Sequence, residues 1–128
     1  MTHILHEWRF ALRYNGVREP PSLLARCAKC RYEVVIRPDV VSFAGDMESV
    51  LKIHDATKGD SWKTCSFKFL VDKLLEEAKE VREAYAAQLW SGVAKEAIDT
   101  ANLAMMVHTR AVDIPLRKRS KRGSGLDA

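Results

Sequence analysis

Four acidic residues in the C-terminal half of the chain have the type and spacing of a site for a divalent cation. They form two pairs, Glu77 with Glu80 and Glu96 with Asp99, in which the partners are three positions apart. Residues with this spacing lie on the same side of a helix, so each pair presents two carboxylates together. Carboxylate oxygens suit Mg²⁺ or Mn²⁺ better than zinc, which favours His and Cys. The pattern predicts a cation site suited to a phosphate chain.

The sequence around these acids distinguishes them from an ordinary exposed helix surface. Glu77 borders the apolar face of its predicted helix, whereas the adjacent Glu76 points further toward solvent. Glu96 and Asp99 are in line with apolar residues on the same side of their helix. One acidic pair alone is most often a solvated surface, but two facing pairs are costly to bury unless a cation neutralises them.

Two helices separated by a short break are predicted to hold the acids. One begins after the N-cap residue Ser66 and continues to about residue 88 with a continuous apolar face. Residues 90–92 form the break, and the next helix covers about residues 93–112. Small side chains along that helix predict close packing at the centre of a bundle. This stripe consists of Ala94, Ala97, Ala101, Ala104 and His108.

An earlier helix is predicted from the N-cap residue Ser42 to about Asp55. The loop over residues 56–65 follows it and contains Trp62, a large aromatic residue that is unusual in a solvated loop. We expect this loop to cover a ligand.

The first 40 residues are predicted to form a small β-rich appendage. Polar and apolar residues alternate over residues 4–14, and Asn15-Gly16 favours a tight hairpin turn. A second strand is expected over residues 32–37. A helix over residues 4–14 stays an alternative, because three apolar residues there are also four apart.

Length and composition favour a single domain in the cytoplasm. The chain has 128 residues, 47% of them hydrophobic, which suits one helical core with a small appendage. It has no run of about 20 apolar residues and no N-terminal signal segment. The net charge of +4 comes entirely from residues 117–128, where five Lys and Arg residues stand against Asp127. Residues 115–128 are therefore predicted to be a disordered basic tail that attracts nucleic acid weakly, if at all.

The order of the acids resembles the signature of a known superfamily. Glu77-x-x-Glu80, then residues 81–95, then Glu96-x-x-Asp99 is similar to the motif of the all-α nucleoside triphosphate pyrophosphohydrolases, which include MazG-like proteins and dimeric dUTPases. The resemblance covers residues 42–112. The segments SFAGDMESVLKIHD, KGDSW and EAIDTANLAMMV further resemble small MazG-like proteins of phages and bacteria.

This resemblance implies a mainly α, MazG-like helical bundle that assembles as a homodimer or homotetramer. It also implies that the four acids bind Mg²⁺ or Mn²⁺, and that the enzyme hydrolyses standard or modified nucleoside triphosphates to a nucleoside monophosphate and pyrophosphate. One of the Glu residues would serve as general base, and the sequence leaves open which. A phage-encoded chain would act in the host cytoplasm.

Four further residues are candidates for binding the nucleotide. Asn102 follows Asp99 by about one turn and offers an amide to ribose or base; an amide that bridges two helices is the alternative. Lys58 and Lys63 are placed to neutralise phosphate, and Trp62 to stack on a base. The alternatives are a packed tryptophan and solvated lysines.

Two residue pairs in the appendage have the spacing of zinc ligands. They are His3-x-x-His6 and Cys27-x-x-Cys30. The His6-x-Trp8 start, followed by Cys27-x-x-Cys30 and a strand, resembles the minimal zinc ribbons of phage proteins. The alternative is a hairpin whose cysteines are ordinary reduced thiols. A zinc ion with four protein ligands would be structural, because it would have no open position for catalysis.

The predicted organisation is therefore an appendage over residues 1–40, an all-α domain over residues 41–114 and a tail over residues 115–128. Pyrophosphohydrolase activity is the leading functional hypothesis. The alternative is a non-catalytic adaptor, in which a zinc ribbon and a helical dimer bind partners and the tail binds nucleic acid weakly.

Overall fold

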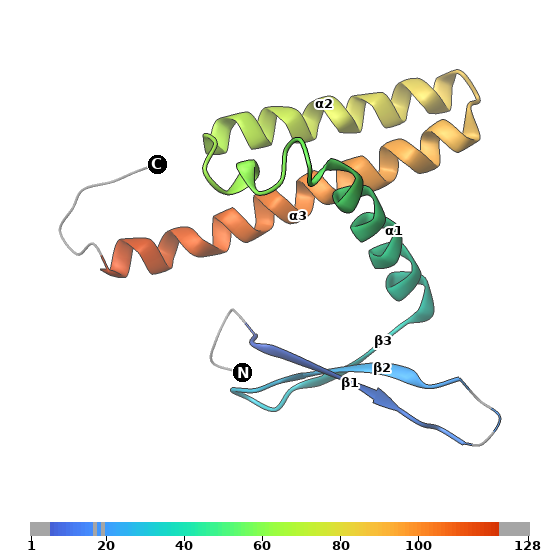
Figure 1. The fold of residues 1–128 in the computed structure, drawn as a ribbon, viewed down its shortest axis with the longest axis vertical. Helices are drawn as coiled ribbons and strands as arrows, with labels where there is room; N and C mark the ends of the chain where they lie inside the picture. Colours follow the sequence, from blue (N-terminus) through green and yellow to red (C-terminus); the bar gives the residue numbers. More distant parts are fainter. Residues whose placement is uncertain (1–5, 17, 19, 121–128) are drawn as a thin grey trace. The chain divides into compact units, whose positions relative to one another are not determined.

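The structure is a computed structural model that describes residues 6–16, 18 and 20–120. It is mainly helical, with a small antiparallel sheet near the N-terminus (Figure 1). The chain divides into a sheet unit, Met1–Gly45, and a helical unit, Asp46–Ala128. The elements in chain order are β1 (Trp8–Arg13), β2 (Ser22–Cys27), β3 (Glu33–Ile36), α1 (Pro38–His54), the 3-10 turn η1 (Ser61–Lys63), α2 (Phe67–Ala86) and α3 (Trp90–Ser120).

The sheet unit contains three antiparallel strands in the order β1-β2-β3. The strands predicted within residues 4–14 and 32–37 are confirmed as β1 and β3. The alternative of a helix over residues 4–14 is wrong. The central strand β2 was not predicted, because its sequence SLLARC consists largely of helix-favouring residues. The predicted tight turn at Asn15-Gly16 is also wrong. Strand β1 ends at Arg13 and β2 begins at its partner Ser22, and of the two turn residues only Gly16 has a positive φ. The Asn15 side chain donates a hydrogen bond to Ser22 Oγ at 2.8 Å.

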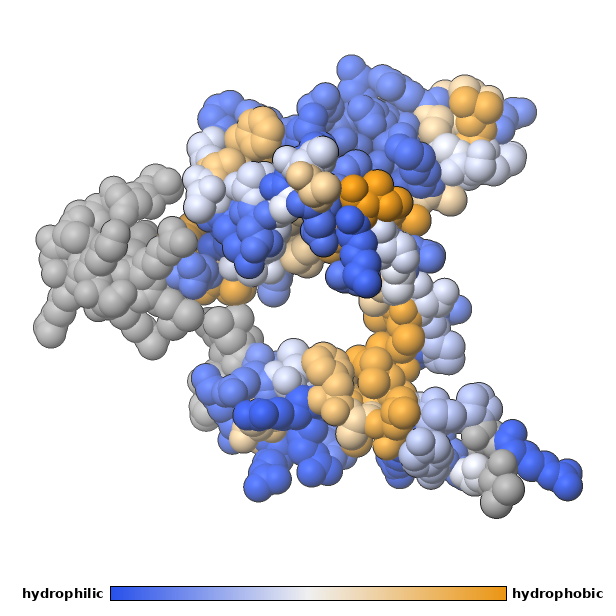
Figure 2. All heavy atoms as spheres, in the orientation of Figure 1, coloured by the Kyte–Doolittle hydropathy of each residue, from blue (hydrophilic) through white to orange (hydrophobic). Residues whose placement is uncertain are grey.

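Apolar burial in the sheet unit is small. Phe10 is paired with Ala25, and Leu12 with Leu23, so these side chains lie on one face of the sheet. Phe10 is nevertheless 63% exposed and Leu12 57% exposed. Among the described residues of this unit only Ala25 and Cys27 are buried. Figure 2 shows hydrophobic side chains at the surface of both units.

Helix α1 begins at Pro38, earlier than the predicted N-cap Ser42. Proline favours the first helical position, where its missing N–H costs no hydrogen bond, and Asp39 in the first turn interacts favourably with the helix dipole. The helix ends at His54, which confirms the predicted end near Asp55.

Helices α2 and α3 form an antiparallel hairpin, and they lie side by side in Figure 1. The predicted N-cap of α2 is confirmed, because Ser66 Oγ accepts a hydrogen bond from the Phe69 N–H at 3.1 Å. The break predicted at residues 90–92 is wrong. The chain turns at residues 87–89, where Gln88 adopts a left-handed conformation with φ of 57°, and α3 begins directly at Trp90.

Helix α3 is longer than predicted, since it continues through Pro115 to Ser120. Pro115 cannot donate a hydrogen bond to the carbonyl four residues earlier, but the following Leu, Arg and Lys residues favour helix. The predicted stripe of small residues is wrong in part, because Ala94, Ala104 and His108 are exposed. No helix within the described residues has the length and apolar composition of a membrane span.

Candidate metal centres and the adjoining cavity

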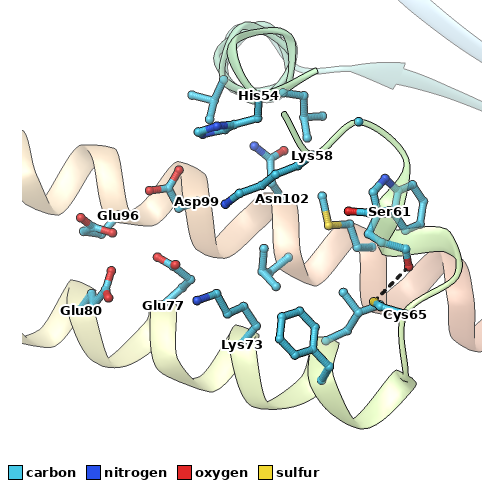
Figure 3. Close-up of a pocket in the computed structure, with 18 of the residues that line it drawn as sticks. His54, Lys58, Ser61, Cys65, Lys73, Glu77, Glu80, Glu96, Asp99 and Asn102 are labelled. Atoms are coloured by element: carbon cyan, nitrogen blue, oxygen red, sulfur yellow. Dashed lines mark hydrogen bonds between the residues drawn. The ribbon is translucent and has the colours of Figure 1, made fainter. Parts of the chain in front are cut away.

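The structure brings together the four acids that the spacing singled out. Carboxylate oxygens of Glu77, Glu96 and Asp99 lie within 4.8 Å of one another. Glu80 lines the same cavity one turn further along α2. Figure 3 shows the two pairs facing each other, one from α2 and one from α3. This arrangement arises because the hairpin is antiparallel and each pair has helical spacing.

The acids are close enough to perturb one another. Burial raises the pKa of Glu77 to about 7, together with a hydrogen bond that the protonated Glu77 carboxyl donates to Glu80 and the charges of Glu80, Asp99 and Glu96. Lys95 compensates in part, since its Nζ lies 3.3 Å from Asp99 Oδ2 and 3.5 Å from Glu96 Oε1. Its side chain is 70% exposed, so solvent screens this attraction.

Two carboxylate oxygens in the cluster have no hydrogen-bond partner. They are Glu77 Oε2 and Glu96 Oε2, and both are inaccessible to solvent. Leaving such atoms unpaired is costly, and the great majority of buried polar atoms do have a partner. An oxygen-only set of acids fits a hard divalent cation, which would satisfy both oxygens at once.

A cavity of about 560 Å³ adjoins the acids. One end carries the four carboxylates, and Lys58 and Lys73 also line the cavity (Figure 3). The cavity also has an extensive apolar lining, which comes from Val50, Leu51, Trp62, Cys65, Phe69, Leu70, Leu103 and Met106. Of the loop residues considered for nucleotide binding, Lys58 and Trp62 line this cavity. Lys63 is not among the lining residues, and its Nζ lies 3.4 Å from Asp60 Oδ2.

Asn102 is 3% exposed and joins two helices across the cavity wall. Its Nδ2 donates a hydrogen bond to the Met47 carbonyl of α1 at 3.2 Å. Its Oδ1 is buried and has no partner, and the residue lines the cavity. The bridging role considered for this amide is therefore observed on its donor side, whereas its acceptor has no protein partner.

Arg110 fixes the loop that carries Trp62. Its guanidinium donates hydrogen bonds to the carbonyls of Trp62 and Cys65, both at 2.9 Å, and lies 5.8 Å from the Phe67 ring centre. This role of Arg110 is not predictable from side-chain spacing, because the backbone carbonyls of a loop leave no pattern in the sequence. The contribution of Cys65 to the cavity was also not predicted, since a single cysteine before a helix is typical of simple packing.

A second cluster of potential metal ligands lies in the sheet unit. His6, Cys27 and Cys30 each offer a ligand atom within 4.8 Å of the others. His3, predicted to join them, lies outside the described residues. Burial would raise the pKa of the Cys27 thiol, but hydrogen bonds from the Cys30 N–H, the His6 side chain and the Lys29 N–H outweigh it and lower the pKa to about 5.

Comparisons with known protein families, curated proteins and solved structures find no match to this chain. Function is therefore inferred from the chemistry of the two clusters and the cavity.

Proposed function

We propose that the chain is a Mg²⁺- or Mn²⁺-dependent nucleoside triphosphate pyrophosphohydrolase. The supporting observation is the cluster of four acids in a cavity that is also lined by lysines and apolar side chains; two buried oxygens of the cluster lack partners. The spacing of these acids resembles that of the MazG-like enzymes. The products would be a nucleoside monophosphate and pyrophosphate, from standard or modified nucleotides.

Each side chain has a distinct role in this proposal. Glu77, Glu96 and Asp99 would hold the cation, with Glu80 beside them. Bound Mg²⁺ supplies charge neutralisation of the phosphates and lowers the pKa of water. Lys58 and Lys73 would balance the phosphate charge that remains. Water would attack the α phosphorus, the bond to the bridging oxygen of the β phosphate would break, and a Glu carboxylate would accept the water proton.

The rest of the cavity is suited to a nucleoside. Its volume of about 560 Å³ falls within the roughly 300 to 1,000 Å³ usual for small-molecule sites. Trp62 and Phe69 offer aromatic surface to a base. The unpartnered Oδ1 of Asn102 would accept a hydrogen bond from a sugar hydroxyl or a base N–H, which gives the site a preference for ligands with a donor there.

We further propose that the active form is a homodimer or homotetramer. Among the described residues of the helical unit, Leu70 is the single buried apolar residue. Leu75 is 64% exposed, and Tyr85 and Trp90 are each 62% exposed. So little buried apolar area is insufficient for an independent domain of this size, and a second copy would cover the exposed side chains.

The test is pyrophosphate release from a panel of standard and modified nucleoside triphosphates, with Mg²⁺ and with Mn²⁺. Glu77→Gln and Asp99→Asn should each lower kcat/KM by roughly 100-fold or more, the scale of losing one group that stabilises the transition-state charge. Glu76→Gln is the matched control. Its carboxylate is adjacent to Glu77 in sequence but exposed and paired with Lys73 at 3.5 Å, so activity should be retained.

Equal activity in Glu77→Gln, Asp99→Asn and wild type would refute the enzyme proposal. If no nucleotide is hydrolysed and deletion of residues 117–128 abolishes a salt-sensitive affinity for nucleic acid, the chain is an adaptor instead.

A further inference from the structure

The cluster of His6, Cys27 and Cys30 has the dimensions of a tetrahedral zinc site. The Cys30 Sγ and His6 Nδ1 atoms are 3.5 Å apart. In such a site, bonds of about 2.3 Å to sulfur and about 2.0 Å to nitrogen place these two atoms about 3.5 Å apart. The third ligand atom, Cys27 Sγ, lies within 4.8 Å of both. Two thiolates and an imidazole also match the ligand types that zinc prefers.

The backbone around the two cysteines forms a tight turn that directs both sulfurs to one point. The turn connects β2 to β3 and is closed by two backbone hydrogen bonds. The Cys27 N–H donates to the Tyr32 carbonyl at 2.8 Å, and the Arg31 N–H donates to the Cys27 carbonyl at 3.0 Å. Arg31, directly after Cys30, adopts a left-handed conformation with φ of 66°. This conformation is costly for a residue with a side chain, so the turn is maintained by what surrounds it.

Neighbouring groups orient the ligands further. The Lys29 N–H points at Cys27 Sγ over 3.4 Å, an interaction that stabilises a metal-bound thiolate. The His6 ring stacks on the Tyr32 ring, with the ring centres 5.4 Å apart, and it also lies beside the Trp8 ring, with the ring centres 4.7 Å apart. These rings fix the imidazole in the orientation in which Nδ1 faces Cys30.

The sheet unit needs stabilisation that its apolar residues do not supply. Only Ala25 and Cys27 are buried among its described residues, and Cys27 is itself a member of the cluster. A small sheet with so little buried area is marginal in water. A bound metal provides folding free energy directly, since the unfolded chain has no preformed site.

We propose that His6, Cys27 and Cys30 bind a structural zinc ion that holds β2, β3 and the start of β1 together. The site lies in a different unit from the acidic cluster, and it does not depend on the proposed nucleotide hydrolysis.

Zinc content of the full-length protein tests this proposal. After reconstitution with zinc and gel filtration, elemental analysis should give one zinc ion per chain. Cys30→Ser should weaken zinc binding by at least about 100-fold, because even residues outside the coordination shell contribute about 10- to 100-fold. Cys65→Ser is the matched control, since Cys65 belongs to the helical unit and should leave zinc content unchanged. Glu77→Gln should also retain zinc while losing nucleotide hydrolysis, which separates the two proposals.

A second measurement uses the wild-type chain and is independent of how the variants fold. Replacement of zinc by Co²⁺ should produce the absorption of a tetrahedral cobalt–thiolate centre. Chelation should increase hydrogen exchange at the Cys27 and Arg31 amides and leave the α2 amides unchanged. A wild-type chain without zinc, equal zinc loss in Cys65→Ser and Cys30→Ser, or unchanged exchange at Cys27 and Arg31 after chelation would each overturn the proposal.

Discussion

A carboxyl group that faces three others, as Glu77 does, keeps its proton to an unusually high pH. Burial and the carboxyl groups of Glu80, Asp99 and Glu96 raise its pKa from 4.5 to about 7. Below pH 4.5 the group is protonated in both the folded and the unfolded chain, so the perturbation costs no stability. Between pH 4.5 and 7 the unfolded chain loses this proton first, and the free energy of unfolding decreases as the pH rises.

We therefore expect the metal-free protein to melt at a lower temperature at pH 8 than at pH 5. Glu77→Gln should flatten this dependence, because a neutral amide does not titrate. Thermal denaturation at several pH values, in the presence of a chelator, measures the effect. Glu76→Gln is the control, in which the melting temperature should depend on pH as it does in the wild type. A slope of the same size in Glu77→Gln would assign the pH dependence to other groups.

The affinity for Mg²⁺ should show the opposite trend. Protons compete with the cation for Glu77, so affinity should increase as the pH rises toward 7 and level off above it. Calorimetric titration of Mg²⁺ at several pH values checks this. Affinity that is constant between pH 5.5 and 8 would exclude Glu77 as a ligand.

Spacing alone identified the four acids and ranked Glu77 above Glu76, because both conclusions depend only on helical periodicity. Asn102 was singled out as well, but its burial and its bond to Met47 were not predictable. The two residues are 55 positions apart, and no local pattern encodes that contact. Arg110 was missed for the same reason, since its partners are carbonyls 48 and 45 positions away.

At the scale of the elements, Arg110 couples α3 to the loop that carries Trp62. Arg110→Met keeps much of the side-chain volume but removes both hydrogen bonds, which should destabilise the protein by about 1.5 to 3 kcal/mol. If the cavity binds nucleotide, KM should increase more than kcat decreases, because the loop forms the cavity wall and no acid is changed. Thermal melting and steady-state kinetics measure the two effects.

The control for this variant is Arg82→Met, which removes the same charge from an exposed position on α2. Arg110→Lys should behave more like Arg110→Met than like wild type, because a single ammonium group lacks the planar fork that reaches both carbonyls. If Arg110→Met has the same stability and KM as Arg82→Met, the loop is held by other contacts.

The helices were predictable because their apolar periodicity extends over several turns and Ser66 is a strong N-cap. Their ends were less so. The chain reverses at Gln88, although Gly92 nearby is the residue that local preference would place at a turn. Strand β2 has a helix-favouring sequence and is a strand because β1 and β3 pair with it on both sides.

At the scale of the whole molecule, the exposed apolar side chains of the helical unit predict self-association. The wild-type chain should be a dimer or tetramer by light scattering at micromolar concentration. Leu75→Glu should shift it toward monomer and lower its melting temperature, because the charge would be buried in the interface. Thr57→Glu introduces the same charge in an exposed loop and should leave the assembly intact. A monomeric wild type at all concentrations would contradict the proposed oligomer.

The hydrogen bond between Asn102 and the Met47 carbonyl also has a consequence for how the protein is made. The α2–α3 hairpin forms from contacts between neighbouring segments, whereas this bond closes a much longer stretch of chain, and such closures come late in folding. During synthesis α1 leaves the ribosome well before Asn102 has been translated. The cavity wall that α1 provides can therefore be completed only once Asn102 has also left the ribosome, which is after the acids of α2 have emerged.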